Sequence, residues 1–148
     1  MSHGKTLKKI QHVIEYLFVR AFHLLVNLTP DRLKKPFAGF LAGAARLLTT
    51  SRVEVARRNL NLVFSESTPA EFKPIIRAVY QNIANNAFDV ADAKSALARI
   101  NTPPHALSQL EAIRTILSTG RPVVFATGHI GNWEILGQHI GREFKECR

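Results

Sequence analysis

Apolar residues in the first thirty positions recur three and four residues apart, as one face of an α-helix requires. Glu15 and Arg20 place charge in the middle of this segment, which disfavours a simple transmembrane span. We therefore predict an amphipathic helix within residues 1–28 that lies in a membrane interface. The alternative is that its apolar face packs against the rest of the protein. The residues of this face are Ile10, Val13, Ile14, Leu17, Phe18, Ala21, Leu24, Leu25 and Leu28.

Helical periodicity continues through residues 29–104. Thr29 is the expected cap of a helix that begins at Pro30, and Lys35-Pro36 is expected to divide it. Two segments, Ser51-Arg52-Val53-Glu54 and Thr68-Pro69-Ala70-Glu71, have the capping-box pattern and predict further helix starts. These residues predict a helical region without chemistry of its own.

The pattern changes after Asn101-Thr102-Pro103-Pro104, the clearest break in the chain. A short run rich in β-branched residues, Pro122 to Thr127, predicts a buried strand, and a helix is expected from Ile130 to about Ile140. This order predicts an α/β domain over residues 105–148. Because one buried strand needs neighbours for its backbone, either a partner chain supplies the rest of the sheet or the domain is truncated. We expect truncation, the simpler of the two.

The positive charge of the chain is concentrated in its first part. The 148 residues carry a net charge of +9, and residues 1–60 hold eleven Lys and Arg against three Asp and Glu. Such charge beside an apolar helix favours an anionic membrane surface as partner. Nucleic acid is not expected, since no nucleic-acid motif occurs. The single cysteine, Cys147, excludes an internal disulfide and a cysteine zinc cluster.

One histidine and one glutamate are candidates for catalysis. His129 and Glu134 are five residues apart, about 140° around a helix, so they can meet only if His129 lies outside it. Glu134 would then hold one ring nitrogen while the other takes a proton. The alternative is that His129 caps the helix and Glu134 is solvated. Spacing alone favours that alternative. However, His129 follows an apolar strand and lies between Gly128 and Gly131, and this context supports the catalytic interpretation as strongly as the alternative. His139 adds no metal site, because the order does not match His-Glu-x-x-His.

The string around this pair resembles a known family. Thr127-Gly128-His129-Ile130-Gly131-Asn132-Trp133-Glu134 resembles the His-x4-Asp/Glu motif of the lysophospholipid acyltransferase superfamily. It is most similar to the lipid A biosynthesis branch, the lauroyl and myristoyl transferases. Two other segments are similar to this branch as well, Arg57-Arg58-Asn59-Leu60 with Val63-Phe64-Ser65-Glu66, and Gly120-Arg121-Pro122-Val123.

The resemblance implies an O-acyltransferase at the cytoplasmic face of a bacterial inner membrane. His129 would be the base and Glu134 its orienting partner, with Gly128, Gly131, Asn132 and Trp133 supporting the turn. The donor would be a thioester of acyl carrier protein or coenzyme A, without metal or other cofactor. The acceptor would be a phosphorylated glycolipid, and a lipid A precursor is the acceptor that the resemblance favours most. The resemblance also implies a glycerolipid-acyltransferase-like α/β fold. Family members are about twice as long, so the alternative is an inactive remnant that binds membranes.

Overall fold

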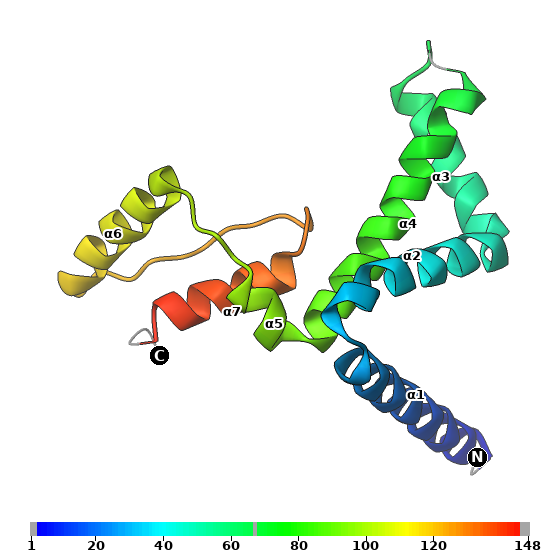
Figure 1. Ribbon diagram of the computed structural model, residues 1–148, viewed down its shortest axis with the longest axis horizontal. Helices are drawn as coiled ribbons and strands as arrows, with labels where there is room; N and C mark the ends of the chain where they lie inside the picture. Colours follow the sequence, from blue (N-terminus) through cyan, green and yellow to red (C-terminus); the bar gives the residue numbers. More distant parts are fainter. Residues whose placement is uncertain (1–2, 67, 146–148) are drawn as a thin grey trace. The chain divides into compact units, whose positions relative to one another are not determined.

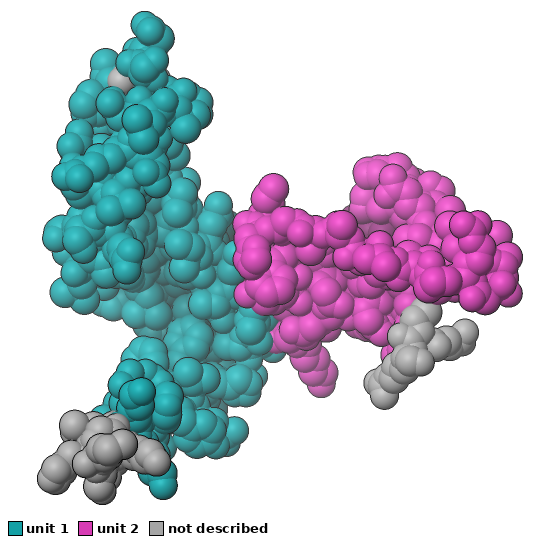
Figure 2. Space-filling view, turned by 180° about the vertical axis from the view of Figure 1, so that it is seen from behind, with its two compact units in different colours: residues 1–92 teal, residues 93–148 magenta. Residues whose placement is uncertain are grey.

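The computed structural model describes residues 3–66 and 68–145, with the backbone alone for residues 3–7; Cys147 lies outside this part. The chain divides into two compact units, Met1–Asp92 and Ala93–Arg148 (Figure 2). Unit 1 contains α1–α4 and unit 2 contains α5–α7 (Figure 1). The helices are α1 (His3–Leu28), α2 (Asp31–Leu48), α3 (Thr50–Val63), α4 (Pro69–Ala91), α5 (Ala93–Ala98), α6 (Pro104–Ser118) and α7 (Trp133–Glu143).

The expected strand is absent, and the α/β prediction is wrong for the described residues. Residues 121–132 follow an irregular path between α6 and α7, and no strand occurs in the part of the chain that the structure describes. The fold is all-α. β-Branched residues favour extended backbone, but a strand also needs a neighbour for its N–H and C=O groups. Val124 is 91% exposed, which shows that this apolar segment is not enclosed.

The core of unit 1 forms where α1, α2 and α4 meet around Phe88. The rings of Phe22 and Phe37 both contact Phe88 edge to face, with centroid distances of 5.5 and 5.6 Å. Val26 and Ala38 complete this core and are almost fully buried. Aromatic pairs of this geometry add to the free energy gained from apolar burial. The first helix is therefore held on the unit by Phe22 and Val26.

The apolar face expected for α1 points away from this core. Its large members from Ile10 to Leu28 are 46–74% exposed, whereas Phe22 and Val26, which do pack, were not part of that face. Within unit 1, this face is therefore not packed against the other helices. No helix in the described residues combines the length and hydropathy needed to cross a bilayer.

Two helix starts in unit 1 differ from the sequence expectations. Thr29 does not cap α2; its hydroxyl donates to the Leu25 carbonyl at 2.7 Å, and α2 continues through Pro36 without a break. Ser51 lies inside α3. Glu54, its expected box partner, instead accepts hydrogen bonds from Arg57 and Arg58, which lower the pKa of this carboxyl to about 2. Competing arginines thus remove the carboxylate that the box requires.

The second capping box is confirmed. The backbone N–H of Thr68 donates to the Glu71 carboxylate at 2.6 Å, and α4 begins at Pro69. Proline suits this position because the first N–H of a helix has no intrahelical partner. The box thus fixes the start of the helix that carries Phe88.

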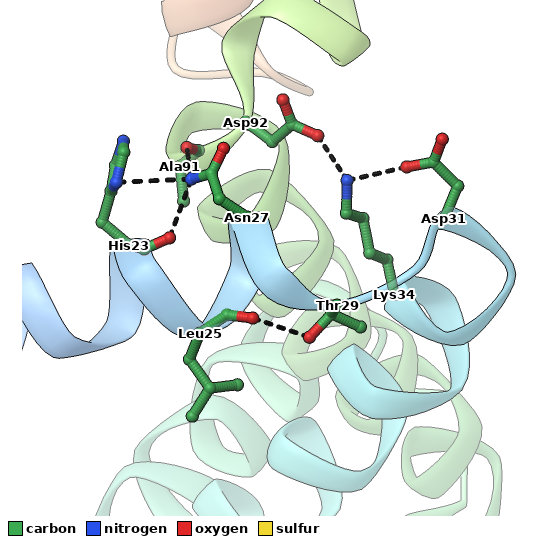
Figure 3. Close-up of polar contacts among 8 residues, drawn as sticks. All are labelled: His23, Leu25, Asn27, Thr29, Asp31, Lys34, Ala91 and Asp92. Carbon is green, nitrogen blue, oxygen red and sulfur yellow. Dashed lines mark hydrogen bonds and ion pairs between the residues drawn. The ribbon is translucent and has the colours of Figure 1, made fainter.

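Polar contacts join the first turn of α2 and the end of α1 to the C-terminal end of α4 (Figure 3). Lys34 Nζ donates to Asp31 Oδ1 at 2.7 Å and also to Asp92 Oδ2. The side chains of Lys34 and Asp92 are only 15% and 11% exposed. Asn27 Nδ2 donates to the Ala91 carbonyl at 3.1 Å and so joins α1 to the same place. These contacts fix the C-terminal end of α4 within unit 1.

Replacing Lys34 with methionine is expected to lower the free energy of unfolding by about 1–3 kcal/mol at pH 7, because Asp92 loses a charged partner in a half-buried place. Hydrogen bonds to Asp31 and Asp92 raise the pKa of Lys34. Because the pKa of Lys34 is higher in the folded chain than its ordinary value of about 10.4, protonated Lys34 stabilises the fold fully at any pH below that ordinary value. This stabilisation is lost only as the pH rises through the raised pKa. Urea unfolding should therefore give the same loss at pH 7 and pH 9. The exposed neighbour variant Lys35→Met should change stability by under about 0.5 kcal/mol; equal losses in both variants would contradict the assignment.

Candidate active site

The candidate site lies in unit 2, on the irregular segment between α6 and α7. The segment starts at Gly120, which has a φ of +76° and whose N–H donates to the Leu117 carbonyl at 2.9 Å. Glycine is favoured at this point because a left-handed residue ends the helix without a Cβ clash. The segment ends at Asn132, directly before α7.

His129 lies on this segment, four positions before the first residue of α7. Its side chain is exposed, and its ring contacts the edge of Trp133 with centroids 4.7 Å apart and planes at 64°. Trp133 is itself 37% exposed. The indole therefore contacts the imidazole, whose side chain is otherwise largely exposed.

Asn132 caps α7. Its side-chain oxygen accepts a hydrogen bond from the Ile135 N–H at 3.2 Å, and Ile135 is buried. The helix therefore begins at Trp133, three residues later than the sequence pattern predicts. Asparagine is among the best N-cap residues, so the identity of residue 132 was a signal for this start. Neither His129 nor any residue before Asn132 caps the helix.

Glu134 is the second residue of α7 and lies in its first turn. A carboxylate is stabilised there by the positive end of the helix dipole. Within the described residues no hydrogen bond or ion pair joins Glu134 to His129. The structure thus brings His129 to Trp133, and the pairing of His129 with Glu134 stays a prediction.

The two motif glycines differ in conformation. Gly131 has a φ of +64°, whereas Gly128 is not among the residues with positive φ. A right-handed helix cannot contain a residue with the Gly131 conformation, which explains why α7 cannot extend back to Ile130. The unusual turn expected between the glycines therefore depends on Gly131.

Replacing Gly131 with alanine is expected to lower the free energy of unfolding by about 1–2 kcal/mol, because an L-residue at this φ is strained. An added Cβ would meet nothing within 4 Å, so the loss comes from the backbone alone. Gly137→Ala is the matched control. It lies inside α7 with equal space and should stabilise by about 0.5–1 kcal/mol. If urea unfolding shows the same sign for both variants, the conformation assigned to Gly131 is wrong.

A charged cluster holds the other end of α7. Arg114 on α6 donates to Glu111 at 3.0 Å and to Glu143 at 2.9 Å, and its guanidinium lies 5.6 Å from the centre of the Phe144 ring. Hydrogen bonds to these carboxylates raise the pKa of Arg114, and the bond to Glu111 has the largest effect. Phe125 of the irregular segment lies against Phe144 at 5.8 Å. These contacts bring α6, α7 and the motif segment together within unit 2.

Comparison with known families adds one finding to this geometry. The family model described as bacterial lipid A biosynthesis acyltransferase matches residues 3–146. The matched range includes the whole segment from Thr127 to Glu134. Comparison with curated proteins and with solved structures gives no match. No group of three His, Cys, Asp or Glu side chains among the described residues is placed to hold a metal ion.

Proposed function

Because the chain belongs to the family of bacterial lipid A biosynthesis acyltransferases, we propose that it transfers a fatty acyl chain from a thioester to a hydroxyl of a phosphorylated glycolipid. The donor is a thioester of acyl carrier protein or coenzyme A, and the acceptor is a lipid A precursor. The observation that supports this proposal is the family match over residues 3–146, which includes a histidine and a glutamate suited to base catalysis.

The proposed reaction begins at His129. One ring nitrogen removes the proton of the acceptor hydroxyl while the oxygen attacks the carbonyl carbon of the thioester. The tetrahedral intermediate collapses as its C–S bond breaks, and the sulfur takes the proton from the imidazolium. The products are an ester and a free thiol, and neutral His129 is restored. The step needs no covalent intermediate on the protein.

Glu134 is proposed to orient His129 and to stabilise the imidazolium. The two residues flank the start of α7, with Glu134 in its first turn and His129 on the segment before it. Catalytic hydrogen bonds often form only when substrate is bound, so we expect the pair to form with the acceptor in place. The first N–H groups of a helix lack intrahelical partners, and those of α7 are proposed to bind the developing oxyanion.

The proposal is tested by incubating the purified chain with a phosphorylated glycolipid acceptor and either acyl-coenzyme A or acyl carrier protein thioester. The expected product is an acceptor with one additional acyl group, measured by mass spectrometry, together with one released thiol. If neither donor gives product, the catalytic function is wrong for this chain. The alternative, a chain that only binds membranes, would then stand.

We also propose that α1 binds the chain to an anionic membrane surface, at the cytoplasmic face of the bacterial inner membrane. The exposed apolar face of α1 and its exposed neighbours Lys8, Lys9 and Arg20 suit insertion into the headgroup region.

Replacing Leu17 with glutamate is expected to reduce binding to vesicles with anionic lipid by about ten-fold or more, because one charge then lies at the centre of the apolar face. Leu17 is 59% exposed, so the fold should tolerate the change. His12→Glu adds a carboxylate on the opposite side of the helix, and vesicle sedimentation should show a much smaller loss. Equal binding by Leu17→Glu and the unchanged chain would exclude this face as the contact.

A further inference from the structure

Unit 2 contains a basic cleft at the C-terminal ends of α6 and α7. The cleft has a volume of about 930 Å³, within the usual range for small-molecule sites. It lies in the same unit as His129 and is lined by the first residues of the irregular segment, which begins at Gly120. Its lining combines uncharged residues of the α6 end and the following segment with the charged residues Arg114, Arg121, Arg142, Glu143 and Lys145.

Among the described residues, the cations of the basic cleft outnumber its acidic residues. Glu143 is the carboxylate among the described lining residues, and it pairs with Arg114. Arg121, Arg142 and Lys145 are exposed, and no acidic group lies within ion-pair distance of them in the described part of the chain. Three cations therefore line the cleft without an acidic partner among the described residues.

Helix dipoles contribute to this arrangement, but they do not define which anion the cleft would bind. Cations are stabilised at helix C-termini, which accounts for Arg142 in the last turn of α7. Arg121 lies three residues beyond the last residue of α6, so its charge is also near a helix C-terminus. Guanidinium groups bind phosphate oxygens through two parallel hydrogen bonds, and two arginines on one cleft match such a ligand better than a carboxylate.

We propose that the basic cleft binds the phosphate of the pantetheine-bearing thioester donor. This assignment rests on the proposed function, because that function supplies a phosphate-bearing ligand. α7 separates the cleft from His129, and its eleven residues give a length of about 16 Å. In an extended pantetheine arm, the distance from the sulfur to the phosphate is similar to this helix length. A donor phosphate in the cleft would thus allow the thioester to reach the N-terminal end of α7.

The proposal is tested by calorimetric titration of the whole chain with coenzyme A at low ionic strength. The unchanged protein should bind coenzyme A about ten-fold or more tightly than pantetheine, which lacks phosphate. Arg121→Gln with Arg142→Gln should weaken coenzyme A binding by about ten-fold or more and leave pantetheine binding unchanged. Arg121→Lys with Arg142→Lys keeps both charges but loses the paired guanidinium hydrogen bonds, so its affinity for coenzyme A should lie between those of the glutamine variant and the unchanged protein.

A matched control removes two other exposed cations, Arg52 and Lys73 in unit 1, by replacement with glutamine. This variant has the same net charge as the cleft variant and should bind coenzyme A normally. Equal coenzyme A binding by the cleft variant and this control overturns the proposal. Tighter binding of glucosamine 1-phosphate than of coenzyme A, lost in the cleft variant, also overturns it by assigning the cleft to the acceptor. Because binding is measured and not turnover, failure here leaves the test of acyl transfer independent.

Discussion

Replacing His129 with alanine is expected to lower the rate of acyl transfer by about 10²–10⁴-fold, the usual contribution of a general base. The acceptor hydroxyl would then have no group to take its proton while it attacks the thioester. The expected change is in kcat more than in KM, because the imidazole acts in the transition state. Thiol release and mass spectrometry of the acylated acceptor measure both constants. Because the side chain of His129 is exposed, the substitution should leave the thermal unfolding temperature unchanged.

His105→Ala is the control for this experiment. His105 is an exposed histidine of α6 in the same unit, so its loss tests whether removing any exposed histidine of unit 2 affects the rate. Its variant should keep the activity of the unchanged chain. A His129→Ala chain that acylates as fast as this control would remove His129 from the catalytic role.

Replacing Phe88 with alanine is expected to lower the free energy of unfolding by about 3–5 kcal/mol, the usual loss for a buried aromatic residue. Phe88 is 5% exposed and contacts both Phe22 and Phe37. Its removal leaves a cavity where α1, α2 and α4 meet, and two edge-to-face contacts are lost. Urea unfolding followed by far-ultraviolet circular dichroism measures the change.

Phe40→Ala makes the same chemical change at a place where the ring is 70% exposed. It should alter the free energy of unfolding by about 0.5 kcal/mol or less. Similar losses for Phe88→Ala and Phe40→Ala would show that the aromatic core does not hold unit 1 together.

Local patterns predicted the helices better than their ends. The prediction of the Thr68 capping box was correct because the Glu71 carboxylate accepts the Thr68 N–H. The Glu54 carboxylate instead accepts hydrogen bonds from Arg57 and Arg58 one turn later. The strand was predicted from β-branched residues, yet its formation depends on neighbouring backbone that no single segment can supply. Pro36 was expected to divide α2, but packing around Phe37 and Ala38 holds the helix through it.

The motif itself could be read from the sequence, since its residues are contiguous. The cap at Asn132 and the conformation of Gly131 are also local and could have been predicted from residue type. The Arg114–Glu143 pair and the basic cleft join residues about thirty positions apart. Such contacts depend on how α6 and α7 pack, which residue spacing does not define. The contact of His129 with Trp133 similarly depends on where α7 begins.

The contacts of α1 with Phe88 also set its rotation about its own axis. Phe22 and Val26 are buried on one side, while the apolar residues from Ile10 to Leu28 are exposed on another. The helix cannot turn to bury the second side without removing the first from the core. A bilayer that receives this apolar face would therefore meet unit 1 in a single roll angle, so α1 would act as an orienting element as well as an anchor.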